Sequence, residues 1–240
     1  MQFTQLLKQK QEDNFGTKAP VIAFLGDSVT QGCFEIYRSG EMLKTIFDNR
    51  ENYANKVQEI LSVLYPEAPV SIINAGINGG TAAEALTRLE RDVLCHKPDL
   101  VVVCFGLNDS NADEEGIKCY ADNLSEIFKQ IKQAGSEVIF MTPNMMNTKL
   151  ARVTEDEVAK TLSDIFANRQ LNGLFDRYIE SAKKVCEEQN VPVCDCYAIW
   201  KKMYECGVDT TNLLCNGLNH PARKMHYLFA TELVKTIFFS

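Results

Sequence analysis

The chain has 240 residues, of which 45% are hydrophobic, and a formal net charge of −7 at pH 7. This length and composition predict a globular protein with a sizeable core. The negative charge argues against nucleic-acid and anionic-membrane partners, because such binding needs a basic patch. No apolar run approaches the roughly 18 residues that would span a bilayer.

The amino terminus and the cysteines indicate the compartment. The first ten residues are polar and lack the apolar segment of a secretory signal. The nine cysteines are odd in number and follow no disulfide rhythm, so we expect free thiols in a reducing cytoplasm. Neither Cys194 and Cys196 nor Cys206 and Cys215 have the C-x-x-C spacing of a structural zinc site. We expect no metal and no cofactor.

Five short apolar runs predict the strands of a parallel sheet. They are apolar on both faces, as strands covered by helices on both sides are. In chain order they are Val21–Leu25, Val70–Asn74, Leu100–Phe105, Glu137–Met141 and Val191–Cys194.

Helical periodicity lies between these runs. Five helices are predicted. They cover Val57–Leu64, about Thr81–Leu94, Leu124–Ile131, about Leu171–Gln189 and the segment from Ala222 onward. The alternation predicts a single three-layer α/β/α domain over residues 1–240, with right-handed crossovers.

One stretch breaks this alternation. Met145–Asn172 follows the fourth predicted strand and is polar, with Thr154, Glu155, Asp156 and Glu157 in succession. We expect an inserted helical segment here. It either overhangs the site or forms a solvated surface helix.

Small polar residues end three of the predicted strands. These ends are Gly26–Ser28, Asn74–Thr81 and Gly106–Asp109, and the segment Asn219–Pro221 precedes the last helix. The carboxyl ends of parallel strands meet at one edge of a sheet, where ligands bind in open α/β folds. We therefore expect these segments to form one site.

Together these residues can carry out acyl transfer. The hydroxyl of Ser28 becomes a nucleophile when a base such as His220 takes its proton. Backbone N–H groups and a side-chain amide can stabilise the resulting oxyanion, at about 3 kcal/mol for each donor. Gly79 lets the backbone approach that oxygen, and Asn108 supplies a neutral amide. Asp27 and Asp109 are expected to order their loops by accepting backbone N–H groups.

In their order, these segments resemble the SGNH, or GDSL-type, esterase/lipase family. The segments are Gly-Asp-Ser, Asn-x-Gly-x-x-Gly, Gly-x-Asn-Asp and a late His-Pro, and the match runs from about Val21 to the end of the chain. The α/β-hydrolase motif Gly-x-Ser-x-Gly does not fit, because position 30 is Thr.

The resemblance implies a flavodoxin-like fold with a five-stranded parallel sheet and hydrolysis of small esters. It also implies roles for four residues. Ser28 is the nucleophile and one oxyanion donor, Gly79 and Asn108 are the other donors, and His220 is the general base.

The chain departs from the family at the acid that usually lies three residues before the histidine, where it has Gly217. That acid holds the imidazole tautomer and stabilises its charged form. Asp209 could reach the ring from upstream, or a backbone carbonyl or Asn216 could orient it and leave a Ser–His dyad. Low activity is the third alternative. We favour a dyad or a displaced acid.

The other site candidates are open to a structural reading. His96 and His226 are expected to be structural. Side chains that could line an acyl pocket, or simply pack, are Phe34, Tyr37, Met145, Met146 and Trp200.

The sequence thus predicts a serine esterase that forms an acyl-enzyme on Ser28. The preferred substrate is an acetyl ester of a carbohydrate or of another small molecule, by analogy with the family. The alternatives are a thioesterase or lysophospholipase-type acylhydrolase, or a binding module that kept the fold and lost turnover at Gly217.

Overall fold

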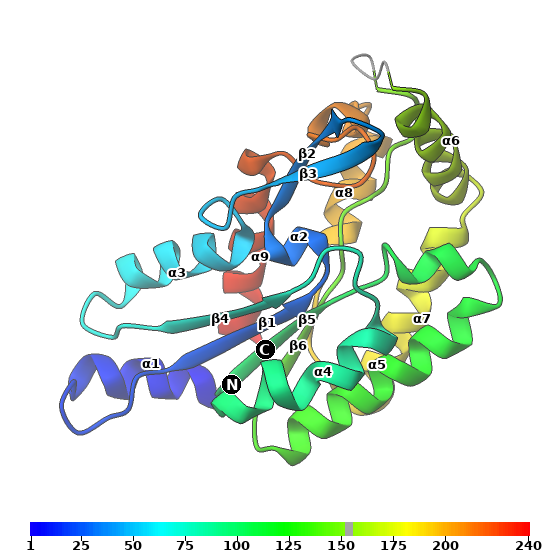
Figure 1. Cartoon of the computed structure of the whole chain (residues 1–240). Coiled ribbons are helices and arrows are strands. Elements are labelled where there is room, and N and C mark those ends of the chain that lie inside the picture. The colour runs from blue at the N-terminus through cyan, green and yellow to red at the C-terminus, as the bar shows by residue number, and fades with distance from the viewer. Residues whose placement is uncertain (152–155) are drawn as a thin grey trace.

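The computed structural model describes residues 1–151 and 156–240 and shows a five-stranded parallel sheet between layers of helices (Figure 1). The strand order is β4-β1-β5-β6-β7, and every neighbouring pair is parallel. The strands are β1 (Val21–Gly26), β4 (Ser71–Gly76), β5 (Leu100–Cys104), β6 (Glu137–Met141) and β7 (Val193–Cys194). The predicted α/β/α fold and its five strands are confirmed.

Helices cover both faces of this sheet (Figure 1). One layer holds α4 (Ala82–Asp92), α5 (Gly116–Gln133) and α7 (Leu174–Gln189), which contact one another in sequence. In the other, α9 (His226–Phe239) contacts α1 (Gln2–Glu12), α3 (Tyr53–Leu64) and α8 (Cys196–Glu205). The other helical segments of the described residues are α6 (Glu157–Leu171), the short α2 (Ser28–Gln31) and the 3-10 turns η1 (Leu94–His96), η2 (Asp109–Ala112), η3 (Thr210–Leu213) and η4 (Arg223–Met225).

Local chemistry sets where the helices begin. Thr81 and Glu84 form a capping box at the start of α4, in which each side chain accepts the other residue's backbone N–H. The predicted helix over Leu171–Gln189 begins instead at Leu174, because Gly173 has a φ of +77° and interrupts the chain after α6. All five residues of β5 are buried, as expected for a central strand.

Among the larger elements of the described residues, α1, α8 and a β-hairpin of β2 (Cys33–Ser39) and β3 (Met42–Phe47) were not predicted, nor were the short helix α2 and the 3-10 turns. The hairpin forms a separate two-stranded antiparallel sheet. It stands beyond the carboxyl ends of the main strands, above α2 (Figure 1).

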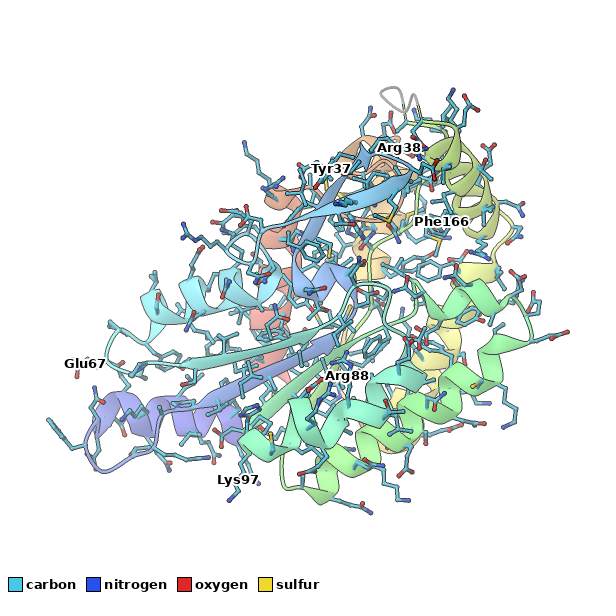
Figure 2. All side chains as sticks on the ribbon, in the orientation of Figure 1. Tyr37, Arg38, Glu67, Arg88, Lys97 and Phe166 are labelled. Carbon is cyan, nitrogen blue, oxygen red and sulfur yellow. The ribbon has the colours of Figure 1, made fainter. Side chains whose placement is uncertain are left out.

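The expected insertion Met145–Asn172 is helical over α6, while Thr154 and Glu155 lie outside the described residues. Asp156 caps α6 and forms an ion pair with Arg38 of β2, with Nη2 and Oδ2 separated by 2.6 Å. Figure 2 labels Arg38 where the hairpin meets α6. In the described part of the chain, no helix is long and apolar enough to cross a membrane.

Candidate active site

Ser28 lies at the carboxyl end of β1, where the chain turns directly into α2. Its side chain is almost fully buried, at 2% exposure. Asp27 caps the turn, because its Oδ1 accepts the N–H of Val29 at 2.9 Å. The N–H of Ser28 belongs to the first turn of α2, where intrahelical bonding leaves such donors unused. The serine therefore presents both a hydroxyl and an N–H donor at the sheet edge.

His220 contacts Ser28 directly. Its Nε2 lies 3.0 Å from Ser28 Oγ, and its Nδ1 lies 2.9 Å from the carbonyl oxygen of Phe34. A carbonyl can only accept, so Nδ1 carries the hydrogen and Nε2 offers its lone pair to the serine hydroxyl. This is the tautomer that a general base requires.

Burial lowers the pKa of His220, while the hydrogen bond to the Phe34 carbonyl raises it. The burial effect is the larger of the two, and the ring is therefore neutral at pH 7. A neutral imidazole is the form that can take a proton from Ser28.

The loop that carries His220 is ordered by Asn216. The Oδ1 of Asn216 accepts the backbone N–H groups of Leu218, Asn219 and His220, at 3.0, 3.0 and 2.9 Å. Gly217 within this loop has a φ of +67°, in the left-handed region that favours glycine. This backbone conformation accounts for glycine at the position where the family usually has aspartate.

The structure does not bring Asp209 to the histidine ring. Asp209 precedes η3, where its Oδ2 lies 2.6 Å from Lys149 Nζ and accepts a hydrogen bond from Asn212 Nδ2. The partner of His220 Nδ1 is instead the Phe34 carbonyl. The expectation of a displaced acid is thus corrected, and among the alternatives the backbone carbonyl is the one that the geometry supports.

The two loops expected to carry the oxyanion donors, Asn74–Thr81 and Gly106–Asp109 (the oxyanion loops), meet through Asn108. Its Nδ2 donates to the carbonyl of Gly80 at 3.0 Å, and an amide carries a second hydrogen. Gly79 is exposed and has a φ of +77°. A Cβ on Gly79 would meet no atom within 4 Å, so this glycine provides the backbone conformation rather than room for a close approach. That corrects the reason expected from the sequence.

Asp109 orders both of these loops, as expected. Its Oδ1 accepts the N–H of Ala82 at the start of α4, and its Oδ2 accepts the N–H of Gly106 after β5, at 2.9 and 3.0 Å. Burial raises the pKa of Asp109 to about 6. Burial, with a smaller contribution from the charge of Asp109, raises the pKa of Asp27 to about 7.

Arg88 is a site residue that the sequence reasoning missed. This buried arginine of α4 donates to the carbonyls of Ala75 and Gly26, at 2.7 and 3.2 Å, and so ties the ends of β4 and β1 together (Figure 2). A cation on the buried face of a helix was the available signal, since buried charges need partners. Similarly, Gln31 Oε1 accepts the N–H of Asn78 at 2.7 Å.

The side chains proposed for an acyl pocket are mostly core residues. Phe34, Met145, Met146 and Trp200 are buried, whereas Tyr37 is exposed on the hairpin. His226 is enclosed by the rings of Phe34, Tyr53 and Phe229, and burial lowers its pKa to about 3. His96 is exposed in η1.

A pocket of about 440 Å³ adjoins the oxyanion loops. Gly79 and Asn108 line one part of it. The other lining residues come from α4, η2 and α5 and their flanking turns: Thr81, Ala83, Asp109, Asn111, Ala112, Gly116, Cys119, Tyr120 and Asn123.

Comparison with known proteins shows that the chain is a carboxylic ester hydrolase. The model of the GDSL-like lipase/acylhydrolase family matches residues 24–228. The chain belongs to this family.

Two kinds of relatives agree with this assignment. An acetylxylan esterase from Geobacillus stearothermophilus is 24% identical over 231 residues, covering 91% of this chain and 94% of that protein. Its crystal structure superimposes with a TM-score of 0.67 over 92% of this chain and 95% of that chain, at 24% identity. A lipase/acylhydrolase from Enterococcus faecalis has a TM-score of 0.65 and 24% identity, covering 91% and 95% of the two chains.

Proposed function

We propose that the chain is a serine esterase that works through an acyl-enzyme on Ser28, with a Ser–His dyad. The observation that carries the proposal is the 3.0 Å contact between His220 Nε2 and Ser28 Oγ. As Oγ attacks the ester carbonyl, His220 takes its proton. The N–H groups of Ser28 and Gly79 and the amide of Asn108 stabilise the oxyanion, each by about 3 kcal/mol in the transition state.

Collapse of this intermediate breaks the bond to the alcohol, which leaves with the proton from His220. A water molecule then gives its proton to the same nitrogen and attacks the acyl-enzyme, which releases the acid and restores Ser28. The carbonyl of Phe34 keeps the ring in the reactive tautomer throughout, because its bond to Nδ1 holds that hydrogen in place.

We propose acetyl esters of carbohydrates as the preferred substrates. The resemblance to an acetylxylan esterase over 91% of this chain supports this class. The pocket beside Gly79 and Asn108 supports it as well, because Asn111 and Asn123 line it with uncharged amides that suit a sugar. Short acyl groups are favoured because most of the large apolar candidates are committed to the core.

Covalent labelling tests the enzyme proposal. A fluorophosphonate should form one adduct on Ser28 in the wild-type chain and none in Ser28→Ala, since the reagent needs the activated hydroxyl. A folded wild-type chain that forms no adduct would favour the binding-module alternative. Full activity in Ser28→Ala would contradict the site assignment.

The preferred acyl group and leaving group of the substrate separate the esterase from its alternatives. We expect p-nitrophenyl acetate to be hydrolysed with a higher kcat/KM than p-nitrophenyl octanoate or an acyl-CoA. Preference for octanoate would favour a lysophospholipase type, and preference for acyl-CoA a thioesterase.

We propose the cytoplasm as the location. All nine cysteines are unpaired, and Cys95, Cys119 and Cys206 are exposed. Exposed thiols persist in a reducing compartment. Fractionation of cells with an antibody against the chain would check this, and recovery in the extracellular or membrane fraction would contradict it.

A further inference from the structure

The carbonyl that orients His220 belongs to the hairpin and not to the main sheet. Phe34 lies on β2, and β2 and β3 form their own two-stranded sheet. The position of the Phe34 oxygen therefore depends on what holds the base of the hairpin against the loop of His220.

An irregularity in the hairpin leaves this carbonyl available. Cys33 pairs with Phe47 and Ile36 pairs with Thr45, and the register shifts between Cys33 and Ile36. Phe34 lies within that shift. Bulges of this kind interrupt the ladder and redirect backbone groups, and they are common beside active sites. Here the carbonyl of Phe34 accepts from His220.

Arg223 contacts the base of the hairpin from the histidine side. It lies three residues after His220, in η4. Its guanidinium binds the carboxylate of Glu35 in a two-pronged arrangement, with Nη1 on Oε1 and Nη2 3.0 Å from Oε2. Its Nε lies 3.5 Å from Asp48 Oδ2, directly after β3.

The same guanidinium also packs on Phe34, with its Cζ 4.3 Å from the centre of the ring. Arg223 thus contacts the residue whose carbonyl orients the base, the residue beside it and the end of the opposite strand. The ion pair with Arg223 lowers the pKa of Glu35, so the carboxylate is charged whenever the enzyme works near neutral pH.

We propose that Arg223 is a positioning residue of the proposed esterase. By pairing with Glu35 and packing on the ring of Phe34, it keeps the Phe34 carbonyl within hydrogen-bond distance of Nδ1 of His220. This inference rests on the proposed function. A neutral carbonyl is a weaker acceptor for an imidazolium than a carboxylate, so its alignment with Nδ1 matters more. In this chain Arg223 and Glu35 align the Phe34 carbonyl without contacting the ring of His220 themselves.

The competing explanation is an ordinary surface ion pair. The side chains of Arg223 and Glu35 are 32% and 38% exposed, and ion pairs as exposed as this contribute little to stability. Arg38 offers a matched control, because it lies on the same hairpin and binds Asp156 through Nε and Nη2. Loss of an ion pair from the hairpin is common to both sites, but only Arg223 contacts Phe34.

Steady-state kinetics with p-nitrophenyl acetate test the proposal. In Arg223→Met we expect kcat to fall at least about tenfold while KM stays within about twofold, since small misplacements of a base are costly. Glu35→Gln should lose less, because Arg223 keeps its contacts with Phe34 and Asp48. The double variant should be no worse than Arg223→Met alone, as expected when two residues act through one contact.

The pH profile distinguishes positioning from mere loss of folded protein. Without the Phe34 acceptor the imidazolium is less stable, so the pKa of His220 falls. The rising limb of the plot of kcat/KM against pH, which follows deprotonation of His220, should therefore move to lower pH in Arg223→Met. The neighbouring His226 stays neutral in this range, because its pKa is about 3. Arg38→Met should keep the wild-type limb and kcat.

Several outcomes would overturn the proposal. The first is a wild-type kcat in Arg223→Met, and the second is an equal loss of kcat in Arg38→Met. The third is a loss of kcat in Arg223→Met that is the same at all pH values and matches the unfolded fraction measured by thermal melting. If Arg223→Met fails to fold, Arg223→Lys retains the charge without the two-pronged contact and should show the same shift of the limb; an unshifted limb would contradict the proposal. A wild-type chain without a fluorophosphonate adduct would contradict the proposed function instead.

Discussion

The Oδ1 of Asn216 lies 2.9 Å from the backbone nitrogen of His220 and accepts its N–H, together with the N–H groups of Leu218 and Asn219. One side-chain oxygen thus organises the whole loop that carries the proposed base. The contact is local in sequence and buried, and it does not depend on the hairpin on the other side of the ring.

Replacing this oxygen should loosen the loop. We expect Asn216→Ala to lower the free energy of unfolding by about 2–3 kcal/mol, because several buried N–H groups lose their acceptor. Activity should fall as His220 loses its fixed position. Urea unfolding and kcat for p-nitrophenyl acetate measure the two effects. Asn216→Asp keeps the acceptor but loses the bond that Asn216 Nδ2 donates to Asn219 Oδ1, and is the control. Equal losses in both variants would assign the effect to that donated bond rather than to the oxygen.

Removing the charge of Asp209 should leave catalysis intact. Its carboxylate contacts Lys149 and Asn212, while the Phe34 carbonyl occupies Nδ1 of His220. We therefore expect Asp209→Asn to keep kcat within about twofold, whereas loss of an orienting acid costs several orders of magnitude in sites that use one. A loss of tenfold or more in a variant that melts like the wild type would restore Asp209 as the third member.

Stability should depend on pH through Asp27. Its pKa is raised to about 7 in the folded chain, against 3.8 as the ordinary value. Between these values the folded state binds the proton and the unfolded state has lost it, so the contribution of Asp27 to stability falls as pH rises and levels off above about pH 7.

Asp27→Asn removes this charge and keeps an oxygen that can accept the N–H of Val29. We expect the variant to gain at least about 1 kcal/mol at pH 8, or roughly 2–4 °C in Tm, with little difference near pH 4. Thermal melting at the two pH values tests this. A gain of the same size at both would assign the effect to packing rather than to the buried charge.

The pocket beside the oxyanion loops should protect a thiol when it is occupied. Cys119 lines this pocket and is exposed, while Cys95 and Cys206 are exposed elsewhere. In Ser28→Ala, which should bind substrate without turning it over, we expect an acetylated xylo-oligosaccharide to slow alkylation of Cys119 by iodoacetamide at least about threefold when the pocket is mostly filled. Alkylation of the other two cysteines should be unchanged, as mass spectrometry of the peptides would show. Equal rates at Cys119 with and without the sugar would place the substrate elsewhere.

The central strands were predictable because burial on both faces leaves a continuous apolar run, as in Leu100–Cys104. The proximity of Ser28 and His220 could be expected because few residue types can act as a nucleophile and a base, and both were expected at the same edge of the sheet. The hairpin was missed although Lys44 of β3 is exposed between the less exposed Leu43 and Thr45. On β2 the alternation is absent, because Tyr37 and Arg38 are both exposed. The strands of the hairpin are half exposed, and their periodicity is correspondingly weak.

The group that orients His220 could not be found by the same reasoning. A backbone carbonyl is present at every residue, so nothing in the identity of Phe34 marks its oxygen as the partner of Nδ1. Its position follows from a register shift in the hairpin and from contacts of Arg223, a residue 188 positions beyond Glu35. The absent acid at Gly217 was visible, but its replacement depended on tertiary structure.

The bond from His220 to Phe34 has an evolutionary consequence. A carboxylate partner is lost by one point mutation, whereas no substitution at position 34 removes a carbonyl, since all twenty amino acids carry one. The vulnerable changes lie elsewhere: substitutions of Arg223, and insertions or deletions between Gly32 and Phe34, which would move a different carbonyl opposite the ring or none at all. The orientation of the proposed base is therefore encoded in the length of a connection and in a distant arginine, and not in the side chain of the residue that supplies the carbonyl.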